Sequence, residues 1–149
     1  AVRGGRKIVI SSYLDYYLDH SYSLTPLSRI YNFEPIFAEL NQSDAQNILG
    51  VEAPLWTEYV PNRARLDFQT FPRLLALAET GWTAKQLKNY ADFRVRLMNF
   101  EDRLNYRDIH LAHPKDVQPS RLKRMFGLLT LLQPQQQITP RENRSLEIN

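Results

Sequence analysis

The sequence contains no cysteine among its 149 residues. That absence excludes disulfide bonds, thiolate metal sites and cysteine nucleophiles, although it leaves the cellular compartment open. The chain also lacks any run of about 18 apolar residues, the length that a membrane-spanning helix needs, so we expect no membrane partner. Its three histidines, His20, His110 and His113, show no metal-ligand spacing with carboxylates. We therefore expect neither a metal nor a cofactor.

An excess of charge of one sign is missing as well. The formal net charge is +3, from 19 basic and 16 acidic side chains that are interleaved along the chain. The densest basic group is Arg121, Lys123 and Arg124, which is typical of a solvated helix face. We therefore expect no nucleic-acid partner. The apolar residues, 43% of the chain, are enough for about one folded domain with a buried core.

Two short apolar runs predict β-strands. Residues Lys7–Ser12 and Asn47–Leu55 are rich in β-branched or apolar side chains, and both are typical of buried parallel strands. Between them, the segment from Pro26 to Pro35 has room for one helical turn, and residues 36–46 for a short helix or a loop.

A helix is predicted after the second strand. Thr70 is a candidate N-cap, Pro72 suits the first turn, and Gly81 suits the end of the helix. This segment is apolar on nearly all sides, so we expect it to be buried. For Trp82, directly after the helix, we expect packing in the interior.

A second, longer helix is predicted from residue 83 to residue 106. Residues 83–86 match a capping box that would begin it. Its apolar residues recur at spacings of three and four, which indicates a stripe that packs on the core. The stripe consists of Tyr90, Phe93, Leu97, Phe100 and Leu104. Residues 120–132 predict one more amphipathic helix, followed by a polar tail.

The order of elements is strand, loop, strand, helix, helix, which favours an α/β fold. Two strands do not make a stable sheet alone. Either further strands are present that the pattern does not reveal, or the chain is a piece of a larger sheet.

Both predicted strands end in residues suited to carbohydrate. Tyr13 and Asp15 follow the first strand, and Trp56 and Glu58 follow the second. Ligands of α/β folds bind beyond the carboxyl ends of the strands. A Trp ring offers an apolar plate to a sugar, carboxylates accept hydrogen bonds from hydroxyl groups, and a Tyr hydroxyl donates one. From the residues alone, a core Trp and surface carboxylates are the more common arrangement, and the sugar pocket is the alternative.

Four segments, in order along the chain, resemble the C-terminal part of the catalytic domain of glycoside hydrolase family 20, the β-N-acetylhexosaminidases. The segments are "VISSYLDYY", "PLSRIYNFEP", "GVEAPLWTEYV" and "FPRLLALAETGWT". The resemblance extends over residues 7–106, and the third segment is its most specific part.

The resemblance implies a fold. The family has a (β/α)8 TIM barrel with its site at the carboxyl ends of the strands. Residues 1–112 would be the C-terminal part of this catalytic domain, with the last two strands and the closing helices. They would be incomplete without the remainder of the barrel. Residues 113–149 would be a C-terminal extension with a short helix and a polar tail.

The resemblance also implies an activity. The family hydrolyses terminal non-reducing N-acetylglucosamine or N-acetylgalactosamine by retaining, substrate-assisted catalysis, in which the 2-acetamido oxygen is the nucleophile. An adjacent Asp-Glu pair supplies the general acid/base and orients the acetamido group. The one acidic pair of these types here, Glu101-Asp102, has the reverse order and lies on a predicted helix. The resemblance therefore implies that the isolated chain is inactive.

The site residues implied by the resemblance are the same four. Tyr13 would donate to the acetamido oxygen, and Asp15 would bind sugar hydroxyls. Trp56 would pack against the terminal sugar, and Glu58 would bind its O4 hydroxyl. A second copy of the motif at residues 17–19 offers an alternative register, but the first copy directly follows the strand.

Two alternatives remain beside this interpretation. One is a sibling specificity such as a lacto-N-biosidase, and the other is a non-catalytic carbohydrate-binding or structural fragment. The resemblance implies a carbohydrate with a terminal N-acetylhexosamine as partner, and a secreted, periplasmic or cell-surface location for a bacterial member. The localisation of this chain stays unknown.

Overall fold

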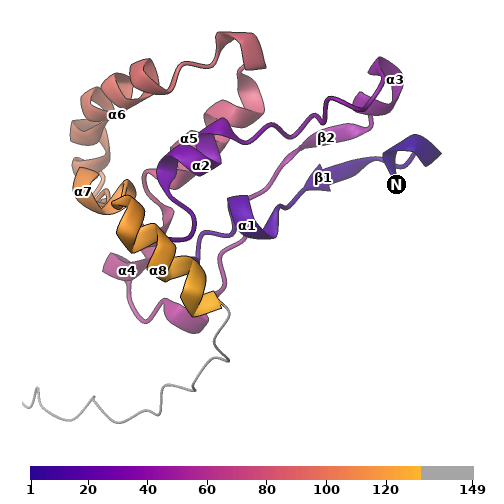
Figure 1. Cartoon of the computed structure of the whole chain (residues 1–149). Helices are drawn as coiled ribbons and strands as arrows, with labels where there is room; N and C mark the ends of the chain where they lie inside the picture. Colours follow the sequence, from indigo (N-terminus) through magenta and orange to yellow (C-terminus); the bar gives the residue numbers. More distant parts are fainter. Residues whose placement is uncertain (132–149) are drawn as a thin grey trace, which may run out of the picture.

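A computed structural model of the protein describes residues 1–131. Its sheet has two strands in this part of the chain, β1 (Ile8–Ile10) and β2 (Ile48–Val51), which lie side by side in Figure 1. They pair in parallel, with Ile8 opposite Ile48 and Ile10 opposite Val51. The structure thus confirms both predicted strands at their centres and their parallel direction.

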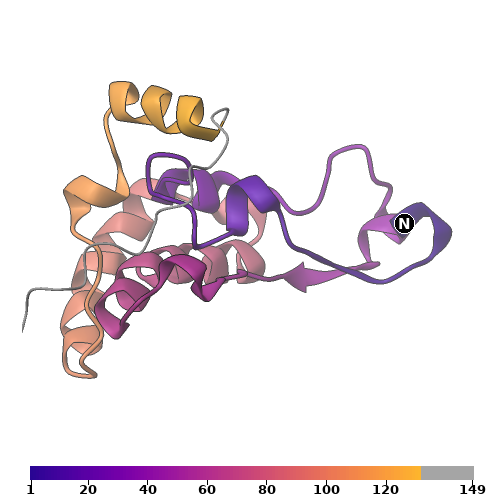
Figure 2. The same ribbon diagram turned by 90° about the horizontal axis from the view of Figure 1, so that it is seen from below.

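The predicted burial of these strands is wrong for the chain described here. Val9 is 48% exposed and Leu49 is 62% exposed. In Figure 1 the strands project beyond the main group of helices, with α3 at their far end, and within residues 1–131 these two side chains are only partly covered. Figure 2 shows the same projection from below. Ile10 and Val51 of the same strands pack against the core, so the side chains of the pair are covered unequally.

Three short helices connect the strands: α1 (Tyr13–Tyr16), α2 (Leu27–Asn32) and α3 (Gln42–Ala45). Helix α2 confirms the turn predicted between the two prolines. Asn41 caps α3, because its side-chain oxygen accepts a hydrogen bond of 2.8 Å from the amide of Asp44.

Two helices, rather than one, follow β2 and the short 3₁₀ turn η2 (Thr57–Tyr59). They are α4 (Arg63–Thr70) and α5 (Arg73–Trp82). The interpretation of Thr70 as an N-cap is wrong, since it ends α4, and Gly81 lies inside α5. The N-cap of α4 is Asn62, whose side-chain oxygen accepts a 2.9 Å hydrogen bond from the amide of Arg65.

The break between α4 and α5 has a simple cause. Pro72 has no amide hydrogen and so cannot continue the hydrogen-bond ladder of α4. The residue before a proline is also driven out of the helical region, and Phe71 is extended here with φ −108° and ψ 134°. The proline that suggested a first turn therefore separates two helices.

The long helix α6 (Tyr90–Asn105) begins later than predicted. Residues 83–86 do not form its capping box, because a 3₁₀ turn, η3 (Lys85–Leu87), comes between. Asn89 is the N-cap, and its side-chain oxygen accepts hydrogen bonds from the amides of Ala91 and Asp92 at 3.0 and 3.2 Å. Asn is one of the residues preferred at the N-cap. The helix therefore begins after Asn89 and not at the residues that match the capping box.

The C-terminal elements are α7 (Pro114–Val117) and α8 (Arg121–Leu131). Helix α8 confirms the last predicted helix, while the predicted polar tail lies outside the described residues. Val117 is buried in the main core, and the amide of Ala112 donates to the carbonyl of Phe71 at 3.0 Å. The boundary predicted at residue 112 stays a prediction.

The core lies where α2 packs on α5, with α6 beside them (Figure 1). It is rich in aromatic and aliphatic side chains. The buried members are Tyr16, Leu18, Tyr22, Leu27, Ile30, Tyr31, Ala76, Leu77, Phe93, Ala112 and Val117. The predicted stripe on α6 contributes Phe93 to this core, and Tyr90 and Leu97 pack against it. Leu104 is buried outside this cluster, whereas Phe100 is 37% exposed. No helix in residues 1–131 is long and apolar enough to cross a membrane.

Candidate functional site

The segments that carry the four predicted site residues meet at one edge of the sheet. Helix α1 follows β1, and η2 follows β2, both at the carboxyl ends of the strands (Figure 1). Backbone hydrogen bonds join the two segments: the amide of Glu52 donates to Ile10 at 3.0 Å, and the amide of Leu18 donates to Pro54 at 2.8 Å. These two bonds connect the segments close to the predicted site residues.

Tyr13 begins α1 and is 57% exposed. Its ring packs edge-on against His20, with ring centroids 4.8 Å apart and an interplanar angle of 86°. It also contacts the ring of Tyr17 at 5.1 Å. One side of the ring is thus held by neighbours, while more than half of the residue remains accessible to a ligand.

Asp15 is held by two donors. The Nε of Arg29 donates to Oδ1 at 2.7 Å, and the Oγ of Ser12 donates to Oδ2 at 2.6 Å. Its side chain is 15% exposed. A carboxylate has about four lone-pair positions, so these two bonds fix its orientation and leave acceptor positions for a hydroxyl group.

Trp56 and Glu58 lie at the turn η2. Trp56 is the N-cap residue of the turn and is 62% exposed, and Glu58 is exposed within it. A Trp ring with this much free surface is unusual for a core residue. Among the alternatives left open by the sequence, the structure excludes a core position for Trp56 in the described chain.

Sequence reasoning missed the buried residue that organises this region, Arg73. It is fully buried and lies at the start of α5. Its guanidinium donates to the carbonyl of His20 at 2.8 Å, to the carbonyl of Gln69 at 2.7 Å and to the carbonyl of Leu18. Burial, the main cause, lowers its pKa to about 10. The sequence feature that could have indicated this role is an arginine at the start of an otherwise mostly apolar helix.

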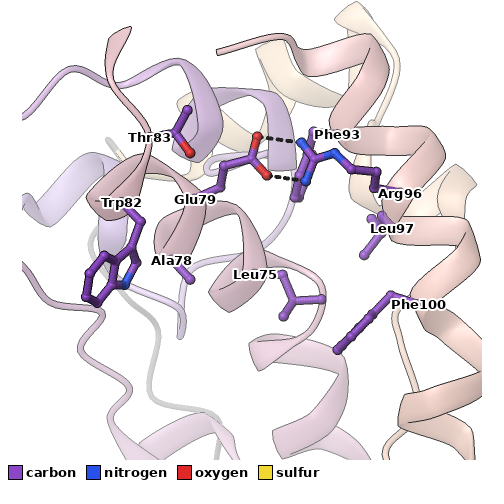
Figure 3. Close-up of a pocket in the computed structure, with 9 residues that line it drawn as sticks. All are labelled: Leu75, Ala78, Glu79, Trp82, Thr83, Phe93, Arg96, Leu97 and Phe100. Carbon is purple, nitrogen blue, oxygen red and sulfur yellow. Dashed lines mark hydrogen bonds and ion pairs between the residues drawn. The ribbon is translucent and has the colours of Figure 1, made fainter. Parts of the chain in front are cut away.

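A cavity of about 360 Å³ lies elsewhere, between α5 and α6 (Figure 3). Its lining is mostly apolar, but Glu79 and Arg96 meet across it with two bonds of 2.7 Å. The hydroxyl of Tyr31 adds a bond of 2.8 Å to Glu79. Because these bonds connect the Glu79 carboxylate of α5 to Arg96 of α6 and to Tyr31 of α2, we interpret this cavity as part of the contact among these helices.

Trp82 lies on the rim of this cavity (Figure 3) and is 92% exposed. The expectation that it packs in the interior is therefore wrong for the described chain. The helix α5 buries the opposite face against α2, through Ala76 and Leu77, so a residue at its last turn can point into solvent.

The Glu79–Arg96 pair predicts a pH effect on stability. Hydrogen bonds from Arg96, and then from Tyr31, lower the pKa of Glu79 below its ordinary value of 4.5, although burial opposes them. A lowered pKa means that the pair contributes its full stability above pH 4.5 and loses it as the pH falls through the lower pKa of the folded state. Since the Arg96 side chain is 51% exposed, we expect about 1 kcal/mol or less.

The measurement is the urea midpoint of the wild-type protein and of Glu79→Gln between pH 3 and pH 7. The difference between the two proteins should shrink as the pH falls below 4.5, the ordinary value for Glu79. Asp92→Asn is the matched control, because Asp92 binds the same arginine from an exposed position within α6. A difference that is constant with pH would contradict the role of the Glu79 charge.

Within residues 1–131, no group of three or more His, Asp or Glu side chains is placed to hold a metal ion. The candidate site thus consists of aromatic rings, carboxylates and a hydroxyl at the carboxyl end of two parallel strands.

The chain is similar to known glycosidases. The model of the family "Glycosyl hydrolase family 20, catalytic domain" matches residues 1–85. A β-hexosaminidase of Porphyromonas gingivalis is 40% identical over 94 residues, 63% of this chain and 12% of that protein. A β-N-acetylhexosaminidase of Cellulomonas fimi is 31% identical over 121 residues, 72% of this chain and 24% of that protein.

Solved structures agree with these matches. A GH20 exo-β-N-acetylglucosaminidase of Vibrio harveyi, in complex with N-acetylglucosamine, aligns with a TM-score of 0.70 and 30% identity over 76% of this chain and 20% of that one. The GH20 β-N-acetylhexosaminidase of Streptomyces coelicolor aligns with a TM-score of 0.69 and 29% identity, over 80% of this chain and 26% of that one.

These findings define the class first: the chain is a member of a glycosidase family. The family match extends over more than half of the chain, from residue 1 to residue 85 of 149. The chain therefore belongs to glycosyl hydrolase family 20, the family of the β-hexosaminidases.

Proposed function

We propose that this chain is the C-terminal part of a β-N-acetylhexosaminidase catalytic domain and provides the last two strands of its (β/α)8 barrel. The observation that carries the proposal is the two-stranded parallel sheet whose apolar Val9 and Leu49 are exposed. In a barrel, such a pair has a further strand at each edge, and side chains on its inner face are covered by side chains of the other strands. The chain also spans only 12% of the Porphyromonas gingivalis relative and 24% of the Cellulomonas fimi relative.

The proposed substrate is a glycan with a terminal, non-reducing N-acetylglucosamine or N-acetylgalactosamine. In the proposed mechanism, the 2-acetamido oxygen attacks the anomeric carbon as the glycosidic bond breaks, and water later opens the oxazolinium intermediate with retention. Support for this substrate class comes from the Vibrio harveyi enzyme, whose structure contains N-acetylglucosamine.

Each of the four residues has a role in this proposal. Tyr13 donates its hydroxyl proton to the acetamido oxygen and holds it near the anomeric carbon. Asp15, already oriented by Arg29, accepts from a sugar hydroxyl. Trp56 packs on the apolar face of the terminal sugar, and Glu58 accepts from the O4 hydroxyl. The exposure of Tyr13, 57%, supports the first copy of the repeated motif as the functional register.

The general acid/base belongs to another part of the proposed barrel. Glu101 and Asp102 lie near the C-terminal end of α6, a helix that does not follow directly on either strand, and both are exposed. Proton transfer to the leaving oxygen needs a carboxyl group within hydrogen-bond distance of it. The Asp-Glu pair would lie at the end of an earlier strand of the intact domain.

A direct prediction is that the purified 149-residue chain does not hydrolyse an aryl N-acetylglucosaminide. It has sugar-binding residues but no acid/base at the strand ends, so no proton reaches the leaving group. Release of the aryl group is measured for the chain and for the intact protein at equal concentration. Enzyme-level turnover by the chain alone would overturn the proposed location of the acid/base.

The sequence of the intact gene product gives the complementary test. An Asp-Glu pair at the end of a strand upstream of residue 1 is expected if the protein is the proposed enzyme. A complete gene product without such a pair would instead favour the non-catalytic carbohydrate-binding fragment.

A further inference from the structure

His20 is a half-buried histidine that the proposed mechanism does not use. It lies on the segment between α1 and α2, which follows β1 at the candidate site. Its ring packs against Tyr13 at 4.8 Å and against Tyr17 at 5.9 Å. We propose that His20 is a positioning residue, which holds the ring of Tyr13 in the orientation needed for its hydroxyl group. The inference rests on the role of Tyr13 in the proposed function.

The backbone beneath His20 is firmly anchored. The Nη1 of Arg73 donates to the carbonyl of His20 at 2.8 Å, and its guanidinium lies 4.2 Å from the ring centroid of Tyr22. Gln69 adds a bond of 2.9 Å to Arg73 and donates to the carbonyl of Asp19 at 3.0 Å. A planar guanidinium can bind several carbonyls in a fixed geometry. The position from which the imidazole reaches Tyr13 is therefore defined by the buried start of α5.

The imidazole is also connected to α1 itself. Its Nδ1 lies 3.4 Å from the Oγ1 of Thr25, and the same hydroxyl donates to the carbonyl of Leu14 at 3.1 Å. Thr25 is fully buried. The imidazole and the helix that begins with Tyr13 thus both contact one buried hydroxyl group, that of Thr25.

The contact with Tyr13 suits a neutral imidazole. Burial lowers the pKa of His20 below its ordinary value; Asp19 opposes this shift, and Arg73 and Arg29 add to it. Aromatic pairs with nearly perpendicular rings are a favourable arrangement, and this pair has an interplanar angle of 86°. The contact restrains a ring that is otherwise 57% exposed. A restrained ring keeps its hydroxyl in place without contact between His20 and the substrate.

The test is a double-mutant cycle in the intact protein, with His20→Ala, Tyr13→Phe and their combination. Misplacing a catalytic group by about 1 Å can cost about a hundredfold in rate, so we expect His20→Ala to lower kcat by about tenfold to a hundredfold, with a smaller change in KM. In the Tyr13→Phe background, where there is no hydroxyl to position, the same change should cost at most about twofold. An aryl N-acetylglucosaminide is the substrate.

Further variants separate positioning from general stability. His20→Phe keeps an aromatic ring and should recover most of the lost kcat. If His20→Ala lowers the unfolding midpoint, His20→Leu, which keeps apolar volume, takes its place in the cycle. His110→Ala is the matched control, because the His110 side chain is 69% exposed; its kcat should equal that of the wild type.

The outcomes distinguish this inference from the proposed function. A loss on His20→Ala that is equally large with and without the Tyr13 hydroxyl overturns the positioning role. The positioning role is also overturned if His20→Ala has a normal kcat while Tyr13→Phe has a lowered kcat. In that case the proposed function stands. Normal kcat in Tyr13→Phe overturns the proposed role of Tyr13 and this inference with it.

Discussion

Replacing Trp56 with alanine in the intact protein is expected to lower kcat/KM on an aryl N-acetylglucosaminide by about 30-fold or more. Truncation of a Trp at the centre of a binding site costs about 2 kcal/mol or more, and this amount corresponds to about 30-fold. The apolar face of the sugar would lose its plate, while the 62% exposure of Trp56 means that little packing is lost. We therefore expect the unfolding midpoint to stay close to that of the wild type.

The chain offers a matched control in its other tryptophan, Trp82, which is 92% exposed on the rim of the α5–α6 cavity (Figure 3). Trp82→Ala makes the same chemical change away from the strand ends. Steady-state kinetics of both variants, with their thermal midpoints, give the comparison. The assignment of Trp56 to the sugar-binding site would be rejected if both variants kept near-normal kcat/KM.

Removing the hydroxyl of Tyr13 is expected to lower kcat by about a hundredfold. A single hydrogen-bond donor that acts on charge in the transition state contributes about 10²–10³ in rate. In the proposed mechanism, this donor aligns the acetamido oxygen as it attacks, so its loss affects kcat more than KM. Tyr13→Phe keeps the ring and therefore its contacts with His20 and Tyr17.

The control for this change is Tyr106→Phe, at a residue that is 93% exposed just after α6. It removes an equivalent hydroxyl group from a position that has no part in the proposed site. Both variants are measured for kcat, KM and thermal midpoint on the same aryl substrate. Equal kcat in Tyr13→Phe, Tyr106→Phe and the wild type would refute the role of the Tyr13 hydroxyl.

The strands were the most predictable elements of the fold. Short apolar runs after a turn determine β1 and β2, and the structure confirms that they are parallel. The prediction that they are buried is wrong, because burial depends on what covers a strand. Val9 and Leu49 are only partly covered within residues 1–131, and the local sequence does not show what covers a strand.

Helix boundaries were less predictable because several residues suit more than one role. Thr70 and the capping box at residues 83–86 both matched helix starts, but Asn62 and Asn89 are the caps that form hydrogen bonds. Helix α4 was not predicted, and Thr70, which was expected to begin a helix, is the last residue of α4. Whether a residue caps a helix depends on the backbone geometry on both sides of it. A sequence motif describes that geometry only in part.

By itself, the sequence determined the family, and it predicted where a candidate site would lie. The family follows from the ordered resemblance of four segments, and the family model matches residues 1–85. The predicted site residues, such as Tyr13 and Trp56, follow from that resemblance and from their position after a strand. The roles of these side chains stay predictions until the kinetic tests are made.

Only the tertiary structure decided which side chains support that site. Arg73 is more than 50 residues away from His20 in the chain, yet it holds the carbonyl of His20 at 2.8 Å, and His20 in turn packs against Tyr13. The tertiary structure also decided which tryptophans are exposed. Trp56 and Trp82 are both accessible to solvent, although only Trp56 lies at the strand ends. The physical reason is that hydrogen bonds and burial depend on neighbours in space, and folding chooses those neighbours from distant parts of the chain.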